Sequence, residues 1–215
     1  MKLYGYWRSG TSYRTRLALA LKGIEVEHIP VNLVTGDQKS ADYTAANPQG
    51  LVPTLVLDDG TALAQSGAII DYLEERYPER PLLPAGPKAR AHVRQLCQIV
   101  GCDIHPLNNL RVLKYLKNEL DQPQAGIDQW AANWITDGFD AFEVLLSRDE
   151  SRGNFCFGGR PGMAECYLLP QIYSARRFGV DMARWPRIGA VEAATLALDE
   201  VQSALPENQV DAVPA

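Results

Sequence analysis

Four prolines close together divide this 215-residue sequence into two parts of different character. They are Pro78, Pro81, Pro84 and Pro87. Because proline fixes φ and removes a backbone donor, this cluster predicts a stiff, extended linker. Short apolar runs typical of strands precede the linker, whereas apolar residues at helical spacing follow it. The sequence therefore predicts an α/β domain over residues 1–80 and an all-helical domain over residues 88–208.

The first part has the pattern β-α-β followed by a β-hairpin and a second helix. We expect its strands over residues 3–7, 25–33, 52–57 and 62–64. Ser12 is a suitable N-cap for a helix that ends near Lys22, with Gly23 in the usual C-terminal position. Ser66 is expected to cap the second helix, and residues 35–45 to form a loop with one helical turn. A parallel pair joined to a hairpin predicts a mixed sheet.

The second part shows amphipathic spacing throughout. We expect its helices over residues 88–118, 127–147, 163–178 and 187–204. Pro106 should kink the first of them. The polar, proline-containing tail over residues 206–215 is expected to be loosely ordered.

Composition excludes several classes of function. The net charge of −5 offers no basic stripe for nucleic acid. No apolar run reaches the ~20 residues that span a bilayer, and the N-terminus lacks a signal-peptide core, so we expect a cytoplasmic protein without a membrane partner. The four cysteines form no C-x-x-C pair and do not cluster with the three histidines. Reduced packing cysteines and no metal site are therefore expected.

One polar stretch, from Arg8 to Arg14, separates the first strand from the first helix. It places hydroxyl groups and backbone N–H groups at a helix N-terminus, where an anion such as a thiolate is electrostatically favoured. From these residues alone two interpretations of Ser9 and Thr11 stay open. They either cap the helix or act on a bound anion, and the local sequence favours capping.

Five motifs spread over nearly the whole chain resemble the zeta class of glutathione transferases. They are Tyr6–Leu19, Asn47–Pro53, Gln65-Ser66, Cys102–Asn109 and Ser174–Phe178. That class contains the maleylacetoacetate and maleylpyruvate isomerases. The resemblance implies a thioredoxin-like N-terminal domain, an all-α C-terminal domain, glutathione as cofactor and a homodimer.

Two departures from the family pattern stand out. Ser9-Gly10-Thr11 replaces the common Ser-Ser-Cys, which removes a protein thiol from the turn and is most similar to bacterial maleylpyruvate isomerases. Gly162 and Glu165 stand where the family usually has Thr and Asp, as the capping box of a structural helix. The second departure affects folding more than chemistry.

The resemblance also implies a set of glutathione-binding residues. These are Ser9 at the thiol with Thr11 assisting, Gln38, Val52 before a cis Pro53, Gln65 with Ser66, and Asn108. A purely structural interpretation remains open for two of these residues. Gln38 could equally be a solvated loop residue, and the role of Ser66 as a helix cap is compatible with binding an α-carboxylate.

For the substrate, the resemblance implies that Arg8, Arg111 and Arg177 hold carboxylates, because guanidinium groups bind them bidentately and stay charged. His105 would assist formation of the enolate; filling a helix kink is the equal alternative. Arg176 is as well explained as a surface residue.

The implied activity is a glutathione-dependent cis–trans isomerisation that converts maleylpyruvate or maleylacetoacetate to the fumaryl isomer in aromatic catabolism. One alternative is a general glutathione transferase that conjugates or dehalogenates small electrophiles. Another is a non-catalytic, transferase-like binding module. A thiol-disulfide oxidoreductase is disfavoured because the turn has no cysteine.

Overall fold

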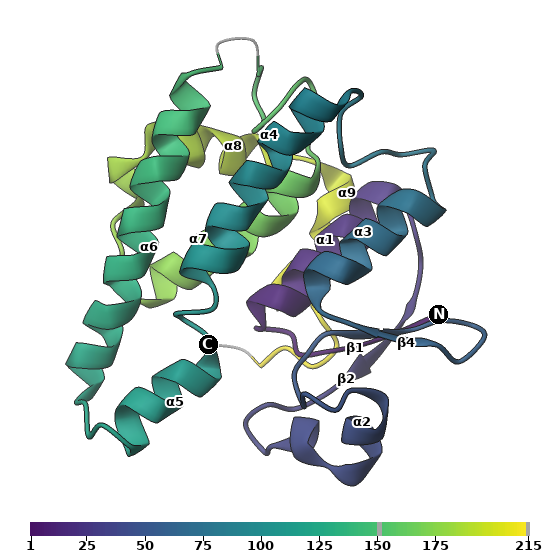
Figure 1. Cartoon of the computed structure of the whole chain (residues 1–215), viewed down its shortest axis with the longest axis vertical. Helices are drawn as coiled ribbons and strands as arrows, with labels where there is room; N and C mark the ends of the chain where they lie inside the picture. The colour runs from purple at the N-terminus through teal and green to yellow at the C-terminus, as the bar shows by residue number, and fades with distance from the viewer. Residues whose placement is uncertain (150–151, 214–215) are drawn as a thin grey trace. The chain divides into compact units, whose positions relative to one another are not determined.

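The computed structural model describes residues 1–149 and 152–213. The chain forms two compact units (Figure 1). The first comprises residues 1–82 together with the segment that begins at Leu198, and the second comprises residues 83–197. The sequence analysis extended the helical domain to residue 208, so its final part differs from this division. The physical reason is that the helix after Leu198 packs on the first helix of the chain.

The first unit is built on a four-stranded mixed sheet of order β2-β1-β3-β4. Its strands are β1 (Lys2–Gly5), β2 (Glu27–Pro30), β3 (Thr54–Val56) and β4 (Ala62–Ala64). β1 and β2 are parallel, whereas β1–β3 and β3–β4 are antiparallel. Helices α1 (Gly10–Lys22) and α3 (Ser66–Arg76) pack side by side on the sheet (Figure 1). The α/β, thioredoxin-like prediction is therefore confirmed, with shorter strands than expected.

The core of this unit explains its pattern of elements. Leu3 and Leu55 are paired across β1 and β3 and are almost fully buried. Ile69, Ile70 and Leu73, at helical spacing, bring the apolar face of α3 into the interior. The expected loop over residues 35–45 contains more helix than predicted, namely η1 (Asp37–Lys39) and α2 (Ala41–Ala46).

Both predicted helix caps of this unit need correction. The N-cap of α1 is Ser9 and not Ser12, because Ser9 Oγ accepts the Ser12 N–H at 3.3 Å. The N-cap of α3 is Gln65, whose φ is 69°, and Ser66 is the first helical residue. Gly23 closes α1 in the left-handed region at φ 67°, as predicted.

The second unit is helical in its described residues. Its helices are α4 (Pro87–Gln98), a π-helical turn η2 (Ile99–Ile104), α5 (Leu110–Asn118), α6 (Gln124–Ser147), α7 (Met163–Arg177), η3 (Met182–Arg184) and α8 (Pro186–Leu196). The core lies between α4, α6, α7 and α8, where Leu96, Phe139, Phe142 and Ile188 are fully buried. The all-helical prediction is confirmed for this unit.

The predicted helix over residues 88–118 is interrupted and not merely kinked. The π-helical turn closes with the N–H of His105 bonded to the carbonyl of Val100, five residues earlier. Pro106 cannot continue the ladder, and a non-helical turn follows until α5. Ile104 packs so closely on Gly138 of α6 that a Cβ at position 138 would overlap its side chain.

The start of α7 accounts for the unusual Gly162 and Glu165. Glu165 accepts hydrogen bonds from the N–H of Gly162 at 2.7 Å and of Cys156 at 2.6 Å. Burial raises the pKa of its carboxyl group. Glycine has no side chain to contribute, so only the Glu165 half of the capping box is present. Cys97, Cys156 and Cys166 are buried as expected of packing residues, but Cys102 is exposed.

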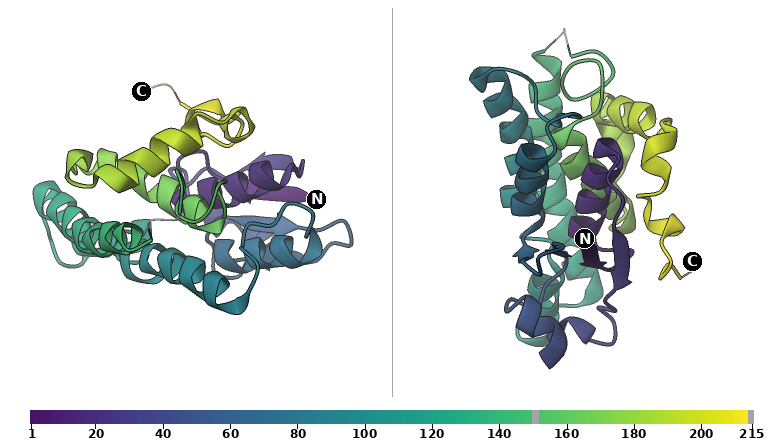
Figure 2. Two further views of the ribbon diagram at one scale, coloured as in Figure 1. Left: turned by 90° about the horizontal axis from the view of Figure 1, so that it is seen from above. Right: turned by 90° about the vertical axis from the view of Figure 1, so that its right-hand side faces the viewer.

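The segment after α8 departs from the prediction. The expected helix over residues 187–204 ends at Leu196, and a short helix α9 (Asp199–Gln202) and a 3-10 turn η4 (Pro206–Asn208) follow. α9 contacts α1, and Figure 2 shows this yellow segment beside the purple start of the chain. The tail was predicted to be loosely ordered, yet side-chain hydrogen bonds anchor it as far as Asp211. None of the described helices is long and apolar enough to span a membrane.

Candidate active site

The turn between β1 and α1 is held by its own hydroxyl groups. The N–H of Ser9 donates to the carbonyl of Tyr6 at 3.0 Å, and Ser12 Oγ accepts the N–H of Tyr6 at 3.3 Å. Ser9 therefore lies at the N-terminus of the 13-residue helix α1, with its Oγ near the unpaired N–H groups of the first turn. The helix dipole favours negative charge at this position.

A chain of hydrogen bonds joins this turn to Val52, the residue before Pro53. Thr11 Oγ1 donates to the carbonyl of Val52 at 2.8 Å, and Ser9 Oγ lies 3.1 Å from Thr11 Oγ1. Because Thr11 has one hydroxyl proton and Val52 accepts it, the Ser9–Thr11 bond uses the proton of Ser9. Ser9 can point that proton toward a bound anion by breaking its hydrogen bond to Thr11. Thr11 could donate to the anion only by breaking its hydrogen bond to the carbonyl of Val52.

The Val52-Pro53 peptide bond is cis, as predicted. A buried polar cluster holds the segment before it. Tyr43 Oη and Asn47 Nδ2 both donate to the carbonyl of Leu51, at 2.6 and 2.7 Å, and both contact Thr54 Oγ1. Burial raises the pKa of Tyr43, so its hydroxyl remains a donor. The sequence analysis named Asn47 only as part of the Asn47–Pro53 motif and missed Tyr43, because no local pattern indicates a contact with Thr54.

The start of α3 carries a second anion-attracting feature. Ser66 is buried and accepts a hydrogen bond from Arg14 Nη1 at 3.1 Å. Arg14 is itself 5% exposed, so its positive charge lies beneath the N-terminus of α3. Gln65 Nε2 bonds to Gln49 Oε1 at 2.6 Å. The sequence analysis missed the role of Arg14, whose partner is 52 residues away.

Gln38 is also drawn into this region. The residue is 9% exposed, which disagrees with the solvated alternative. Its Oε1 is buried and has no hydrogen-bond partner among the described residues. The carbonyl of Gln38 lies 2.8 Å from where a Cβ of Gly50 would be, so only glycine allows this approach. The first unit thus contains six predicted cofactor positions, of which Ser9 and Val52 are joined through Thr11. The six are Ser9, Gln38, Val52, Pro53, Gln65 and Ser66.

Arg8 is the exposed member of the turn. Its guanidinium lies 5.3 Å from the centre of the Trp7 ring. No ion pair joins it to any carboxylate in the described ranges 1–149 and 152–213. Its positive charge is therefore available to an anionic ligand.

The second unit contains the other predicted residues. His105 and Asn108 follow the π-helical turn, and the indole N–H of Trp130 donates to the carbonyl of Leu107 at 2.9 Å, which fixes this segment on α6. His105 is half-buried. Both side-chain amide atoms of Asn108 are buried and lack a partner within the described chain. A buried amide without a partner is costly, so these two atoms are suited to hydrogen bonding with a ligand.

The arginines of this unit differ in their contacts. Arg111 is exposed in the first turn of α5. Arg177, the last residue of α7, is exposed and lies 6.0 Å from the Phe178 ring. Arg176 forms a bidentate pair with Glu192, with Nη2–Oε2 at 2.6 Å. This pairing agrees with its interpretation as a structural surface residue.

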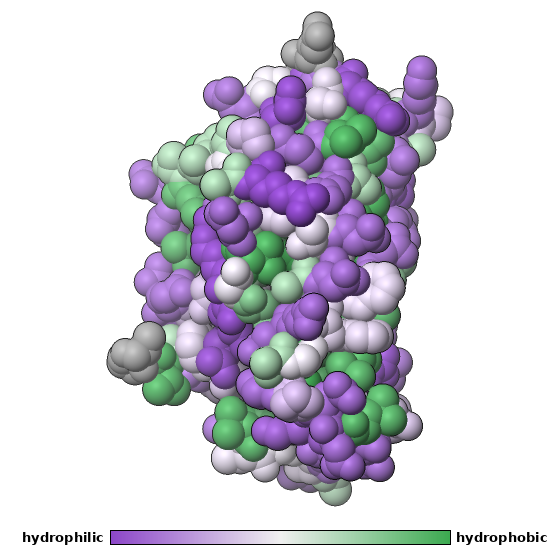
Figure 3. All heavy atoms as spheres, turned by 90° about the vertical axis from the view of Figure 1, so that its left-hand side faces the viewer, coloured by the Kyte–Doolittle hydropathy of each residue, from purple (hydrophilic) through white to green (hydrophobic). Residues whose placement is uncertain are grey.

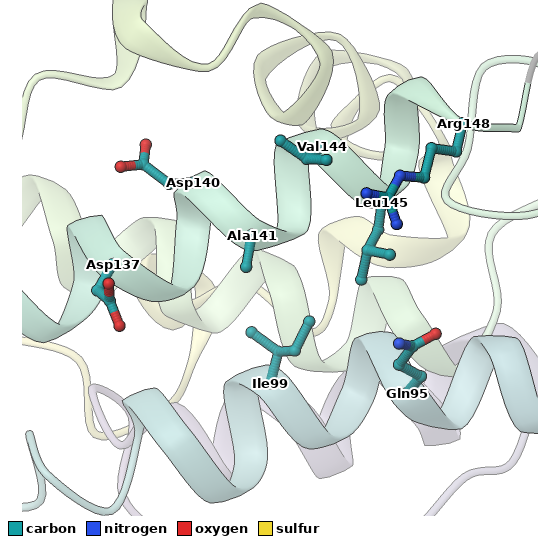
Figure 4. Close-up of a pocket in the computed structure, with 8 residues that line it drawn as sticks. All are labelled: Gln95, Ile99, Asp137, Asp140, Ala141, Val144, Leu145 and Arg148. Carbon is teal, nitrogen blue, oxygen red and sulfur yellow. The ribbon is translucent and has the colours of Figure 1, made fainter.

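One hollow of this unit was not anticipated. It is a groove of about 550 Å³ between α4 and α6. Figure 4 shows an apolar floor that includes Ile99 and Leu145, with Asp137 and Asp140 toward one end and Arg148 at the other. Figure 3 shows apolar residues among hydrophilic ones on the face that carries α6. None of the predicted site residues lines the groove.

Comparisons with known proteins agree on one family. The N-terminal domain of glutathione S-transferases matches residues 8–76. A maleylpyruvate isomerase from a Ralstonia species is 50% identical over 212 residues, which cover 98% of this chain and 99% of that protein. Among solved structures, a holo maleyl pyruvate isomerase, described as a bacterial glutathione S-transferase of the zeta class, has a TM-score of 0.97 at 49% identity and covers 99% of this chain and 100% of its own.

A second solved structure carries ligands. It is a maleylacetoacetate isomerase from Methylobacterium extorquens AM1 with bound malonate and glutathione, with a TM-score of 0.95, 40% identity and 100% coverage of both chains. Such identity over nearly the full length extends well beyond a shared fold. The chain belongs to the zeta class of glutathione transferases, the family of the maleylpyruvate and maleylacetoacetate isomerases.

Proposed function

We propose that this chain isomerises maleylpyruvate or maleylacetoacetate to the fumaryl isomer with glutathione as cofactor, in aromatic catabolism. The observation that carries the proposal is the hydroxyl pair of Ser9 and Thr11 at the N-terminus of α1, bonded to the residue before cis Pro53. This arrangement suits a thiolate. It also holds no cysteine, so the nucleophile comes from the cofactor and not from the protein.

The polar groups of the first unit fit glutathione. Ser9 offers a hydroxyl donor at the N-terminus of α1 for the sulfur. Ser66, with the buried Arg14 beside it, offers a positive helix N-terminus for a carboxylate. Gln38 has a buried oxygen without a partner, which an amide or ammonium group of the tripeptide would satisfy.

When bound, glutathione supplies a thiol that adds reversibly to the cis double bond, so that rotation and loss of the sulfur give the trans isomer. The free thiol has a pKa of about 8.5 and is mostly protonated at neutral pH. Ser9 lowers this pKa by donating to the anion, and α1 assists through its dipole. Thr11 sets the position of Ser9 and of Val52 at the same time.

The cationic residues act on the substrate. We assign Arg8, Arg111 and Arg177 to its carboxylates and to the negative charge that develops on the carbonyl during addition. For Arg8 and Arg111, the absence of an ion pair in the described chain supports this assignment. Asn108 would bind glutathione through its unpaired amide, and His105 would hydrogen-bond the developing enolate oxygen. The malonate and glutathione in the Methylobacterium relative support this combination of ligands.

The test is an ultraviolet assay of maleylpyruvate and maleylacetoacetate with and without glutathione. We expect turnover of a maleyl substrate only when glutathione is present. If neither substrate reacts while an aryl halide or haloacid is conjugated, the chain is a general transferase. If no substrate of any kind reacts, it is a binding module.

We further propose that the chain forms a homodimer in the cytoplasm. The groove between α4 and α6 offers an apolar floor, and Val144 at its edge is 48% exposed. The four free cysteines suit a reducing compartment. Light scattering of the purified protein tests the dimer, and Val144→Glu should weaken it if this groove is the interface.

A further inference from the structure

The segment after α8 returns to the first unit and reaches the turn that carries Arg8 and Ser9. We call residues 198–213 the C-terminal strap. Val201 and Ala204 of the strap are buried, and α9 packs on α1. Figure 2 shows the strap beside α1. It covers a cavity of about 20 Å³ next to Trp7, which is no larger than a single water needs.

Both peptide groups that flank Trp7 are bound by side chains from distant positions. The N–H of Trp7 donates to Asp211 Oδ2 at 3.0 Å. The carbonyl of Trp7 accepts from Arg16 Nη2 at 2.9 Å, and Arg16 Nε donates to the carbonyl of Ala204 in the strap at 2.9 Å. The strap therefore holds Trp7 at two points, directly through Asp211 and indirectly through Arg16.

The segment that carries Asp211 is itself held in place by hydrogen bonds. Gln209 Nε2 donates to the carbonyls of Ser203 and Leu205, both at 2.8 Å, and the N–H of Ala212 donates to the carbonyl of Gln209 at 3.0 Å. These bonds fold the strap into a compact turn on either side of Asp211. Its carboxylate is thus presented at a defined position.

His28 lines the same small cavity. Burial and then the nearby Arg16 charge lower the pKa of its imidazole, although Asp211 opposes this. At neutral pH His28 is therefore uncharged. The charged groups that face the Trp7 peptide are Arg16 and Asp211.

We propose that Asp211 is a positioning residue for catalysis, which orients the Trp7 peptide and thereby the Arg8 side chain and the Ser9 hydroxyl that follow it. A charge-assisted hydrogen bond is directional and about twice as strong as a neutral one. Ser9 Oγ donates to Thr11 Oγ1 and accepts the N–H of Ser12, so a small rotation of the preceding peptide changes the direction in which its proton points. A displacement of ~1 Å in a catalytic group can cost about a hundredfold in rate. The proposal rests on the roles proposed above for Ser9 and Arg8.

The test uses the full chain with Asp211→Ala and Asp211→Asn. The matched control is Glu207→Gln, since Glu207 is an exposed carboxylate of the same strap without a hydrogen bond or ion pair in the described chain. Two quantities are measured, kcat/KM for the maleyl substrate and the pH titration of the ultraviolet thiolate absorbance of bound glutathione.

We expect Asp211→Ala to lower kcat/KM about tenfold, the scale of one lost charged hydrogen bond, and to move the thiol titration toward higher pH. Asp211→Asn keeps one oxygen that accepts from Trp7 and should retain activity within about threefold of the wild type. Glu207→Gln should match the wild type in both measurements.

Two results would overturn the proposal. In the first, Asp211→Ala lowers the melting temperature while kcat/KM and the thiol titration stay at wild-type values, which makes the strap a structural clamp only. In the second, Asp211→Asn loses as much as Asp211→Ala. If Asp211→Ala does not fold, Gln209→Ala loosens the strap and keeps the carboxylate, and the same two measurements decide.

Ser9→Ala, measured in parallel, separates this proposal from the site assignment. If Ser9→Ala leaves the thiol titration unchanged, the role proposed for Ser9 is wrong, and the strap proposal, which depends on that role, fails with it. If Ser9→Ala responds and Asp211→Ala does not, only the strap proposal fails.

Discussion

The hydroxyl turn of the first unit and the candidate residues of the second unit are held in opposite ways. In the first unit, Ser9, Thr11 and Val52 are hydrogen-bonded to one another, and the cluster around Tyr43 supports them. In the second unit, the amide of Asn108 is buried without a partner in the described residues, and Arg111 is exposed without an ion pair there. A cofactor that returns after every turnover suits a preformed site. Groups that remain unsatisfied suit an arriving ligand, which we propose to be the dianionic substrate at Arg111 and glutathione at Asn108.

The largest expected effect tests the preformed side. Ser9→Ala removes the hydroxyl donor at the sulfur, so kcat/KM should fall about a hundredfold, as for other single donors to a developing anion. The thiolate titration of bound glutathione should move to higher pH. Ultraviolet assays at a series of pH values measure kcat/KM and the thiolate titration.

Ser40→Ala is the matched control for that variant. Ser40 is also a helix N-cap, since its Oγ accepts the N–H of Tyr43 at 3.3 Å at the start of α2. It should lose about 1 kcal/mol of stability with little change in the thiol titration. If the two variants behave alike, Ser9 is a cap and nothing more.

The second effect concerns the cations. Arg8→Ala and Arg177→Ala should each reduce kcat/KM on the maleyl diacid by roughly thirtyfold, which corresponds to ~2 kcal/mol for one charged hydrogen-bonding group. A neutral electrophile such as an aryl halide should lose far less. Arg184→Ala, which breaks a pair with Asp140 on the surface, serves as the control. Equal losses on both substrates would contradict a carboxylate-binding role.

The third effect distinguishes the role of Thr11 from that of Ser9 within the turn. Thr11→Val keeps the shape of the side chain but breaks the bonds to Ser9 and Val52. We expect the KM for glutathione to rise about tenfold, since the loss of one or two buried hydrogen bonds is worth ~1–2 kcal/mol. The thiol titration should move less than in Ser9→Ala. An equal or larger movement would mean that Thr11 donates directly to the sulfur.

The smallest effect compares stability in the two units. Tyr43→Phe removes a hydroxyl with two partners and should cost about 1–2 kcal/mol in the free energy of unfolding. Asn108→Leu replaces an unpaired amide by an apolar group of similar size and should be neutral or stabilising, yet weaken glutathione binding. Denaturant unfolding and calorimetry measure the pair. A large destabilisation by Asn108→Leu would show that its amide has a structural partner.

Much of the fold was predictable because its signals are local. The proline linker, the hairpin strand over Ala62–Ala64 and the start of α7 at Met163 agree with the prediction. Helix ends were less accurate. The cap of α1 was placed at Ser12 although Ser9 provides it, because both serines satisfy the same local pattern and only the chain path from β1 decides between them.

The candidate site was predictable where a motif is continuous, as in Ser9 to Thr11 or Val52-Pro53. Arg14 and Asp211 were missed because their partners lie 52 and 204 positions away in the sequence. Tyr43 was missed because no local pattern indicates its contact with Thr54. The predicted loose tail failed for the same reason, since polar composition does not reveal that Asp211 meets Trp7. The helix over residues 88–118 failed differently, because one proline and a close contact between Ile104 and Gly138 end it before α5.

By itself the sequence determined the two classes of structure, the boundary between them at the prolines, and a polar turn without a cysteine. These follow from periodicity and residue type within a few positions. Only the tertiary structure decided which groups are paired around that turn. Thr11 bonds to Val52, 41 residues away, and Trp7 bonds to Asp211, 204 residues away. Such contacts depend on how the sheet and helices pack and not on any local pattern.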